Sequence, residues 1–344
     1  MSAALAVVAA GLHTTVQDRG RFGYQAFGVP VSGALDVESL EIANRLAGND
    51  PDLPAVEILH LGPTLRVEAD SVRVAVAGGS AEIEVQGEPP ASLGGWRSAL
   101  LRRGQVFRVH RLGASVCCYL AVEGGFAVEP VLGSASTYVR GGFGGFRGRA
   151  LAAGDALPLA QTNAAERSEL ALIPPNETRG DRLIRVVLGP QRDHFTEAAV
   201  QALLSAEFLV SKDADRMGLR LEGPRLGHRG GWDIVSDGIA TGAIQVPGSG
   251  QAILLLADHQ TTGGYPKIAT VISADLPLVG RRKPGDRIRF AAVEVAEAEK
   301  LRREARAALD ATIASMAPPR PRGGLDLDSL HETNLISGVV FDQL

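Results

Sequence analysis

The chain has 344 residues, enough to bury a sizeable core and to form two domains or one duplicated domain. Its formal net charge is −4, so neither nucleic acid nor a membrane surface is expected to attract it. The two cysteines, Cys117 and Cys118, are adjacent in an apolar run, where a disulfide would be strained, and we expect both to be reduced. The apolar start, 1–10, is too short to span a membrane, and a cytoplasmic protein is predicted.

Short apolar runs separated by glycine and proline fill the first half of the chain. This pattern predicts a mainly β fold (α+β) with a few helices. Strands are expected within 5–12 and, after one helix, within 56–122. The helix should begin after Asp36, a favourable N-cap residue, and end before Gly48. We assign residues 1–160 to an N-terminal β domain.

The second half begins with a change in composition. Residues 161–181 are rich in Asn, Glu, Pro and Arg and are predicted to form a linker. The segment 182–292 again has strand-like runs and is predicted to be a C-terminal β domain. Segments 152–159 and 283–290 each place a Gly-Asp turn before a strand, which suggests that the two β domains are related. Residues 293–344 should form a long helix followed by a tail.

One polar loop, 257–267, lies between two apolar runs, 252–256 and 268–272, that should be buried strands. The loop carries a carboxylate, an imidazole, an amide, hydroxyls, a phenol and an ammonium. Such varied groups on a loop held by rigid strands favour a binding or catalytic site. An ordinary polar hairpin turn is the alternative. The candidate site residues in this loop are Asp258, His259, Gln260, Thr261, Thr262, Gly263, Gly264, Tyr265 and Lys267.

Three further polar loops carry groups that suit the same site. Arginine can hold a carboxylate or phosphate through two hydrogen bonds, and aspartate, histidine and lysine can move protons or polarise a carbonyl oxygen. The same charges also suit exposed ion pairs, and the histidine also suits a structural hydrogen bond. The candidates are Gln17, Asp18, Arg19, Arg21 and Tyr24 in the first loop, Asp215, Arg216 and Met217 in the second, and Ser236, Asp237, Thr241 and Gln245 in and after the third.

Several common catalytic motifs are absent from the sequence. No Gly-Lys pair occurs, which excludes a P-loop of the usual form, and no Gly-x-Ser-x-Gly elbow is present. His331 and Glu332 lack the second histidine of a zinc-protease motif, and no Cys/His cluster occurs, so no metal site is predicted in this chain. No lysine is flanked by methionines, so the chain is not expected to carry biotin.

Seven motifs occur together in the order found in one family. The chain resembles the KipA family, whose members are also called the C subunit of 5-oxoprolinase and allophanate hydrolase subunit 2. The carboxyltransferase domain of urea carboxylase is a larger relative. The resemblance covers roughly residues 5–315. The motifs lie at 14–21, 28–36, 43–46, 215–218, 236–239, 245–247 and 258–265.

The resemblance implies two cyclophilin-like β-barrel domains and an obligate KipI-like partner, the B subunit of 5-oxoprolinase. With a third protein, the A subunit, such chains use ATP to phosphorylate 5-oxo-L-proline and open its lactam ring to L-glutamate. ATP with Mg²⁺ would then bind at a site shared between the proteins, because this chain has no P-loop. The carboxyltransferase relatives instead move a carboxyl group from carboxybiotin to an amide nitrogen. A small amide or lactam is therefore the expected substrate.

Residue type suggests roles for the candidate residues in such a site. Those that would move protons or stabilise negative charge are Asp258, His259 and Lys267. Those that would bind the substrate or ATP are Asp18, Arg19, Arg21, Arg216, Met217, Ser236, Gln245, Gln260, Thr261, Thr262, Gly263, Gly264 and Tyr265. Two other functions stay open: a carboxyltransferase component that acts on an amide such as urea, and a non-catalytic regulatory protein that antagonises a KipI-like kinase inhibitor.

Overall fold

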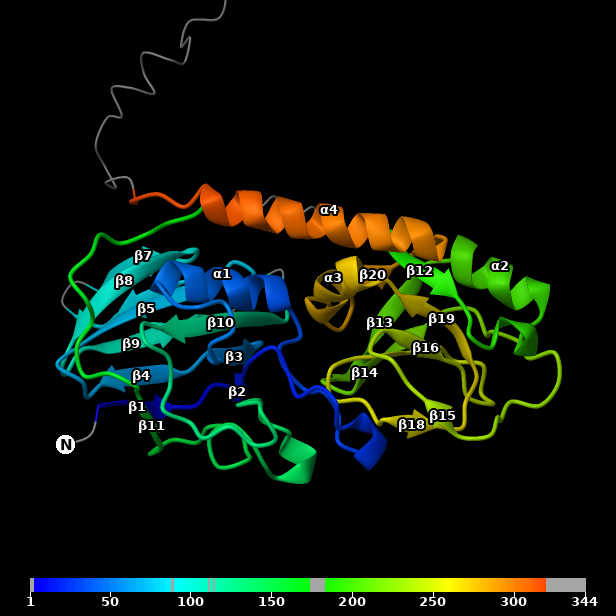
Figure 1. The fold of residues 1–344 in the computed structure, drawn as a ribbon, viewed down its shortest axis with the longest axis horizontal. Coiled ribbons are helices and arrows are strands. Elements are labelled where there is room, and N and C mark those ends of the chain that lie inside the picture. The colour runs from blue at the N-terminus through cyan, green and yellow to red at the C-terminus, as the bar shows by residue number, and fades with distance from the viewer. Residues whose placement is uncertain (1–2, 88–89, 111, 114, 174–182, 320–344) are drawn as a thin grey trace, which may run out of the picture.

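The computed structural model describes residues 3–87, 90–110, 112–113, 115–173 and 183–319. Two β-rich halves lie side by side, and one long helix crosses the same face of both (Figure 1). Strands far outnumber helices, so the prediction of a mainly β fold is confirmed. The predicted tail beyond 319, and 174–181 of the predicted linker, lie outside the described residues.

The first half contains two sheets that enclose one apolar core, to which Leu65 of one sheet and Leu120 of the other belong. Its strands are β1 (Ala4–Ala9), β2 (His13–Gln17), β3 (Ala55–Leu59), β4 (Thr64–Val67), β5 (Ser71–Ala77), β6 (Ile83–Val85), β7 (Ala91–Gly94), β8 (Arg97–Arg102), β9 (Val106–Val109), β10 (Cys117–Val122) and β11 (Ala156–Pro158). The six-stranded sheet has the order β11-β1-β4-β9-β6-β7, and the five-stranded sheet has the order β2-β3-β10-β5-β8. Only β2–β3 and β6–β7 are consecutive strands of one sheet, so at each of the remaining steps from β1 to β11 the chain passes from one sheet to the other.

Strand β10 is apolar along its whole length because both of its faces are covered. Leu120 and Val122 face the core between the two sheets. Tyr119 and Ala121 point the other way, toward a second core that continues into the other half of the molecule. The two halves therefore share one continuous apolar cluster.

Helix α1 (Val37–Ala47) packs on the outer face of the five-stranded sheet, against β5 and β10. The side chain of Asp36 accepts a hydrogen bond from the backbone N–H of Ser39 at 3.1 Å, which is a standard N-cap. Gly48 ends the helix in the left-handed conformation, with φ at 85°. The predicted bounds of this helix are confirmed. Two short 3₁₀ turns, η1 (Gln25–Phe27) and η2 (Val139–Gly141), complete the first half.

The second half is built on one eight-stranded sheet of order β20-β13-β14-β17-β16-β19-β12-β21. The strands are β12 (Ile184–Leu188), β13 (Phe208–Asp215), β14 (Gly218–Glu222), β16 (Ala243–Gln245), β17 (Ile253–Leu255), β19 (Lys267–Val271), β20 (Arg287–Ile288) and β21 (Phe290–Ala292). The two edge strands, β20 and β21, are separated only by Arg289, so the sheet closes on itself as a nearly complete barrel. A two-stranded ribbon, β15 (Asp237–Gly238) with β18 (Thr262–Gly263), lies at one end of it.

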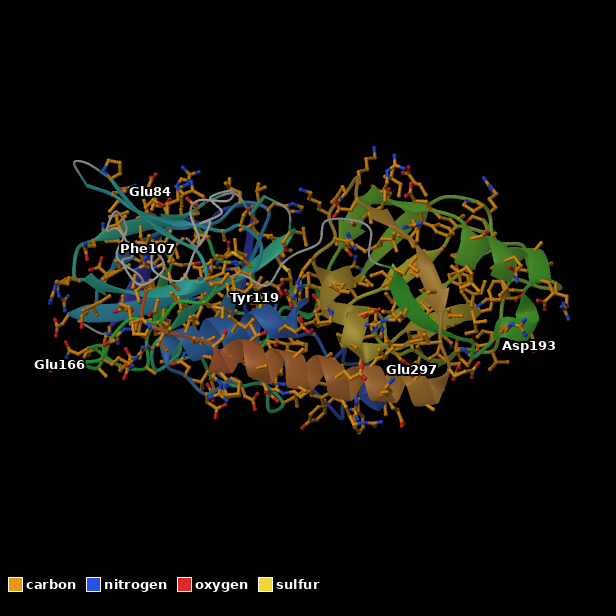
Figure 2. The ribbon with its side chains drawn as sticks, turned by 90° about the horizontal axis from the view of Figure 1, so that it is seen from above. Glu84, Phe107, Tyr119, Glu166, Asp193 and Glu297 are labelled. Carbon is orange, nitrogen blue, oxygen red and sulfur yellow. The ribbon has the colours of Figure 1, made fainter. Side chains whose placement is uncertain are left out.

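Short helical elements surround this barrel: η3 (Arg192–His194), α2 (Glu197–Ser205), η4 (Ser273–Asp275) and α3 (Leu276–Gly280). The predicted long helix is α4 (Val295–Ala314), which contacts η4 in the second half and α1 in the first. Seen from above, α4 spans the junction, with Glu297 over the second half (Figure 2). No helix within the described ranges is long and apolar enough to cross a membrane.

An ion pair fastens α4 to the first half. Arg306 of α4 donates two hydrogen bonds to the carboxylate of Glu41 in α1, both at 2.8 Å. The side chain of Glu41 is only 3% exposed, whereas that of Arg306 is about half exposed. Hydrogen bonding to Arg306 lowers the pKa of Glu41, although partial burial opposes the shift.

We expect Arg306→Ala to lower the free energy of unfolding by about 1 kcal/mol at neutral pH, since the pair lies at a partly exposed surface. Because the pKa of Glu41 is depressed in the folded state, this contribution is present above its ordinary value of 4.5 and is lost as the pH falls through the lowered pKa. Urea denaturation of the wild type and of the variant, at neutral pH and at about pH 3, measures the loss of unfolding free energy at each pH. Arg303→Ala, at an exposed position of the same helix, is the control, and an equal loss for Arg306→Ala at both pH values would contradict this account.

Candidate functional site

A buried ion network joins the two halves at Arg216, which lies in the turn between β13 and β14 and is 5% exposed. Its Nε lies 2.9 Å from Asp258 Oδ2 and its Nη2 lies 3.1 Å from Asp258 Oδ1. Its Nη1 donates to Glu57 of β3, and its Nη2 also donates to the carbonyl oxygen of Gly33 at 2.7 Å. Two predicted site residues, Arg216 and Asp258, are thus brought together, but they serve the contact between the halves.

Glu57, which the sequence reasoning missed, is the centre of this network in the first half. Its Oε2 accepts hydrogen bonds from the Tyr119 hydroxyl at 2.7 Å and from the backbone N–H of Leu35 at 2.9 Å. The N–H of Asp36 donates to the same hydroxyl at 2.9 Å, and Asp36 in turn pairs with Arg281 from the second half. Burial acts to lower the pKa of Arg216, but the charges of Glu57 and Asp258 outweigh it and raise the pKa overall. Asp258 therefore has the geometry of an ion-pair partner.

His259, the next residue, is buried beside this network with a defined tautomer. Its Nδ1 lies 2.6 Å from the carbonyl oxygen of Gln260, which can only accept, so Nδ1 carries the proton. Its Nε2 lies 3.1 Å from the Thr241 hydroxyl and must then accept a hydrogen bond from it. Burial lowers the pKa of His259, and the ring is neutral at pH 7. This arrangement allows Nε2 to take a proton from the hydroxyl.

Lys267, at the start of β19, is buried with its ammonium turned toward the ribbon. Its side chain is 2% exposed, and its Nζ lies 2.9 Å from Asp237 Oδ2 and 3.3 Å from the carbonyl oxygen of Gly238. Gln191 supports both partners: its Oε1 accepts from the N–H of Lys267 at 3.1 Å and its Nε2 donates to Asp237 Oδ2 at 3.2 Å. The hydrogen bond from Lys267 lowers the pKa of Asp237. Gln191 was not predicted, because a glutamine after a Gly-Pro pair gives no chemical signal in a sequence.

The ribbon also places two amides and a glycine in close contact. Gln260 Nε2 donates to Gln245 Oε1 at 3.1 Å. A Cβ on Gly263 would lie 2.8 Å from Gln245 Nε2 and 2.8 Å from Ile239 Cδ1, so a larger residue at this position would have to displace the ends of these two side chains. Within the loop 257–267, Thr261 is buried, Gly263 and Gly264 are half-buried, and Gln260, Thr262 and Tyr265 are exposed. Ser236, which comes just before β15, is also exposed.

The predicted residues of the first loop bind neighbouring groups of their own half. The carboxylate of Asp18 accepts from the N–H of Gly20 at 2.8 Å and the N–H of Ala135 at 2.7 Å. Arg19 pairs with Glu41 of α1 at 2.7 Å. The structure therefore does not bring these side chains to the ribbon.

Arg21 is fully buried, and its guanidinium donates to backbone carbonyl oxygens of Val131 at 2.9 Å and Ser136 at 2.8 Å. It lies near enough to Asp258 for their charges to interact, but burial dominates and lowers the pKa of Arg21. Met217, next to Arg216, is half-buried, and its carbonyl oxygen accepts from the N–H of Leu256 at 2.9 Å. Neither residue contacts the ribbon of β15 and β18 through these hydrogen bonds.

Ser32 is a third residue that the sequence reasoning missed, after Glu57 and Gln191. Its N–H donates to the carbonyl oxygen of Ala257 at 3.0 Å, and this hydrogen bond joins the segment 28–36 of the first half to the loop 257–267 of the second half. It has a left-handed backbone, with φ at 54°, which is uncommon for a residue with a side chain. A serine within a Gly-rich turn looks like turn chemistry, so only the folded chain reveals this contact.

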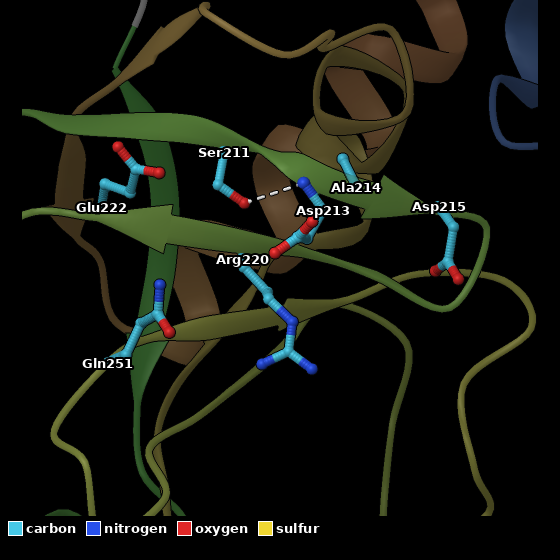
Figure 3. Close-up of a pocket in the computed structure, with 7 residues that line it drawn as sticks. All are labelled: Ser211, Asp213, Ala214, Asp215, Arg220, Glu222 and Gln251. Carbon is cyan, nitrogen blue, oxygen red and sulfur yellow. Dashed lines mark hydrogen bonds between the residues drawn. The ribbon is translucent and has the colours of Figure 1, made fainter.

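A hollow of about 470 Å³ lies on β13 and β14, and none of the residues bound to Lys267 or His259 lines it (Figure 3). No predicted site residue except Asp215 lines it; its wall consists of Ser211, Asp213, Ala214, Asp215, Arg220, Glu222 and Gln251.

Among the described residues, no group of three or more His, Cys, Asp or Glu side chains could hold a metal ion. The most varied chemistry therefore lies in the ribbon cluster, which we define as Lys267, Asp237, Gln191, Gln245, Gln260, His259 and Thr241.

The chain is similar to known proteins in family, in sequence and in structure. The model of the family described as "Carboxyltransferase domain, subdomain A and B" matches residues 27–292. The chain is 37% identical over 300 residues to the C subunit of 5-oxoprolinase from Escherichia coli (strain K12), covering 87% of this chain and 94% of that protein. It is 38% identical over 296 residues to the same protein from Haemophilus influenzae, covering 86% and 93%.

Among solved structures, the urea amidolyase of K. lactis matches with a TM-score of 0.82 at 30% sequence identity. The match covers 90% of this chain but only 20% of that chain, so this chain corresponds to about a fifth of the larger protein. The expected relation to carboxyltransferase domains is confirmed in both sequence and fold.

We expect Glu57→Gln to lower the free energy of unfolding by about 3–5 kcal/mol, because it removes one partner from a buried ion network and leaves charge on Arg216 poorly balanced. Urea denaturation monitored by circular dichroism measures the change. Glu68→Gln breaks an exposed pair with Arg66 and should cost less than about 1 kcal/mol. If Glu57→Gln and Glu68→Gln lowered the free energy of unfolding by the same amount, the buried network would stabilise the fold no more than an exposed ion pair does.

The pKa of His259 should lie below its ordinary value of 6.5, since burial disfavours the charged ring. Nitrogen-15 NMR of the imidazole across the pH range gives the midpoint and the tautomer, and His259→Gln assigns the signal. We expect the proton on Nδ1 above the midpoint. A midpoint above 6.5, or a proton on Nε2, would contradict the hydrogen bonds to Gln260 and Thr241.

Proposed function

Because the chain belongs to the family of the carboxyltransferase domain, subdomains A and B, we propose that it is the C subunit of an ATP-dependent 5-oxoprolinase. It would act with a KipI-like B subunit and an A subunit to open 5-oxo-L-proline to L-glutamate. The observation that carries this proposal is the match to the E. coli 5-oxoprolinase protein over 94% of its length. The urea amidolyase, by contrast, is about five times as long as the matching region.

The ribbon cluster supplies groups that suit a lactam. A lactam presents one N–H and one C=O, and Gln245 and Gln260 offer side-chain amides that pair with each other in the same way. Lys267 supplies a buried positive charge for an anionic substrate. His259, with Thr241, supplies a neutral imidazole that can accept a proton. These residues support binding and proton transfer by this chain.

The described residues do not form a complete site for ATP and Mg²⁺. The three arginines predicted to hold phosphate or carboxylate are all engaged by groups of the chain itself: Arg19, Arg21 and Arg216. No metal-holding group of acidic, histidine or cysteine side chains is present in the part of the chain described here. We therefore propose that the nucleotide and its metal bind mainly to the partner proteins.

A second candidate is a carboxyltransferase component that acts on an amide such as urea. The TM-score of 0.82 to urea amidolyase favours it, since the whole fold is shared. It requires a biotin carrier elsewhere, so the neighbouring genes distinguish the two: those for the other two 5-oxoprolinase proteins indicate the first function, and one for a biotin-carrying protein indicates the second.

We expect Lys267→Met to lower kcat/KM for 5-oxoproline by at least about a hundredfold in the complex of all three 5-oxoprolinase proteins, because a buried charge in the site is lost. ATP-dependent release of glutamate is the measurement, with assembly checked by size-exclusion chromatography. Lys212→Met, at an exposed position of β13, is the matched control and should leave the rate unchanged. Absence of turnover in the folded, assembled wild-type complex would overturn the proposed function.

A further inference from the structure

The ion pair between Lys267 and Asp237 is unequal in exposure. The side chain of Lys267 is 2% exposed, whereas that of Asp237 is 55% exposed. A buried ammonium requires an anionic partner, because an unpaired charge in the interior is strongly destabilising. An exposed carboxylate has no such requirement, since water solvates it well. The pair therefore joins a cation that must keep an anion to an anion that can leave.

The backbone of Lys267 is also held by more contacts than that of Asp237. Lys267 is held in the barrel, where β19 pairs with β16, and Gln191 contacts both its N–H and its carbonyl oxygen. Asp237 lies in β15, a strand of two residues that pairs only with β18. In the segment that leads into this ribbon, Val235 and Trp232 are exposed. The cation is thus fixed and its carboxylate partner lies on a small surface element.

The position of Asp237 Oδ2 defines where an anionic oxygen would bind. Two donors converge on this atom: Nζ of Lys267 at 2.9 Å and Nε2 of Gln191 at 3.2 Å. The other carboxylate oxygen, Oδ1, accepts from the N–H of Gly238 at 2.8 Å, a contact local to the ribbon. An ammonium and an amide N–H that share one oxygen form a recognition point for a carboxylate.

We infer that Lys267 and Gln191 bind the carboxylate of a small substrate, and that Asp237 occupies this position until the substrate replaces it. This rests on the proposed function in one respect: 5-oxoproline carries a carboxylate beside its lactam. With that carboxylate on Lys267, the lactam lies on the side of Gln245, which pairs with Lys267 in the register of β16 and β19. Asp237 then turns to water, and the buried ammonium is never left without an anion.

The exchange explains why a site of this kind keeps a carboxylate of its own. The cost of burying the ammonium is met in both states, so the substrate competes only with Asp237. The apparent dissociation constant is then the intrinsic one divided by the fraction of molecules in which Asp237 has left. Removing the carboxylate of Asp237 should therefore tighten the binding of small carboxylates.

Isothermal titration calorimetry of the full chain, alone and in the complex with its two partner proteins, tests this. Four probes are used: 5-oxoproline, its uncharged amide 5-oxoprolinamide, acetate and inorganic phosphate. We expect Asp237→Asn to bind 5-oxoproline and acetate about tenfold more tightly than the wild type, as displacement of a self-ligand populated at about 90% requires. The uncharged amide should show no such gain, and Lys267→Met should bind neither acid. Asp233→Asn, an exposed aspartate of the same loop, should leave all affinities unchanged.

The outcomes separate this inference from the proposed function. Unchanged or weaker binding of both acids by Asp237→Asn and by Asp237→Ala would overturn the inference, as would an equal gain for the uncharged amide. A gain for phosphate alone would also overturn it and would indicate a phosphate site. A gain for acetate together with no turnover of 5-oxoproline by the assembled wild-type complex would sustain the anion exchange and refute the proposed substrate.

Discussion

The buried ion network of Arg216, Glu57 and Asp258 is the constraint on which the arrangement of the molecule depends. Glu57 belongs to β3 in the first half, and the other two residues belong to loops of the second half. A guanidinium with this degree of burial is stable only where carboxylates and carbonyl oxygens accept hydrogen bonds from its N–H groups. Because these acceptors come from both halves, the hydrogen bonds of Arg216 form only when the halves are placed as they are here. The shared apolar cluster adds attraction but no comparable directionality. The network therefore orients the halves, and the apolar contact stabilises them.

The same network divides the loop between β17 and β19 into two parts with different tasks. Near the start of the loop, Asp258 is bound to Arg216 and holds the halves together. At the other end, Lys267, the first residue of β19, faces the ribbon and carries the positive charge of the ribbon cluster. His259 lies between these ends, bound to Gln260 and Thr241, so the imidazole is placed by both. A loop held in this way at both ends keeps its side chains in fixed positions without a helix beneath it.

Local features of the fold were predictable from sequence, because local interactions determine them. The mainly β pattern, the N-cap at Asp36, the end at Gly48 and the long helix α4 depend on neighbours within a few residues. The partners of charged groups were not predictable. Glu57 and Arg216 are 159 residues apart, and Gln191 and Lys267 are 76 apart, so only the tertiary fold brings them into contact. Residue type alone made Arg216 a predicted ligand for substrate, whereas in the folded chain its donors are taken up by Glu57, Asp258 and the carbonyl oxygen of Gly33.

Closure of the barrel limits how another protein can attach to the second half. The segment that contains β20 and β21 supplies both edges of the eight-stranded sheet, and the N–H of Ile184 donates to the carbonyl oxygen of Arg289 at 2.8 Å between them. A sheet whose edges meet offers a visiting polypeptide no row of free backbone groups to pair with. The first half differs, because its two sheets end at β7, β11, β2 and β8. Backbone-to-backbone recognition by a neighbouring protein is therefore possible at the open sheet edges of the first half and at the two-stranded ribbon, whereas contacts with the eight-stranded sheet have to be made by side chains.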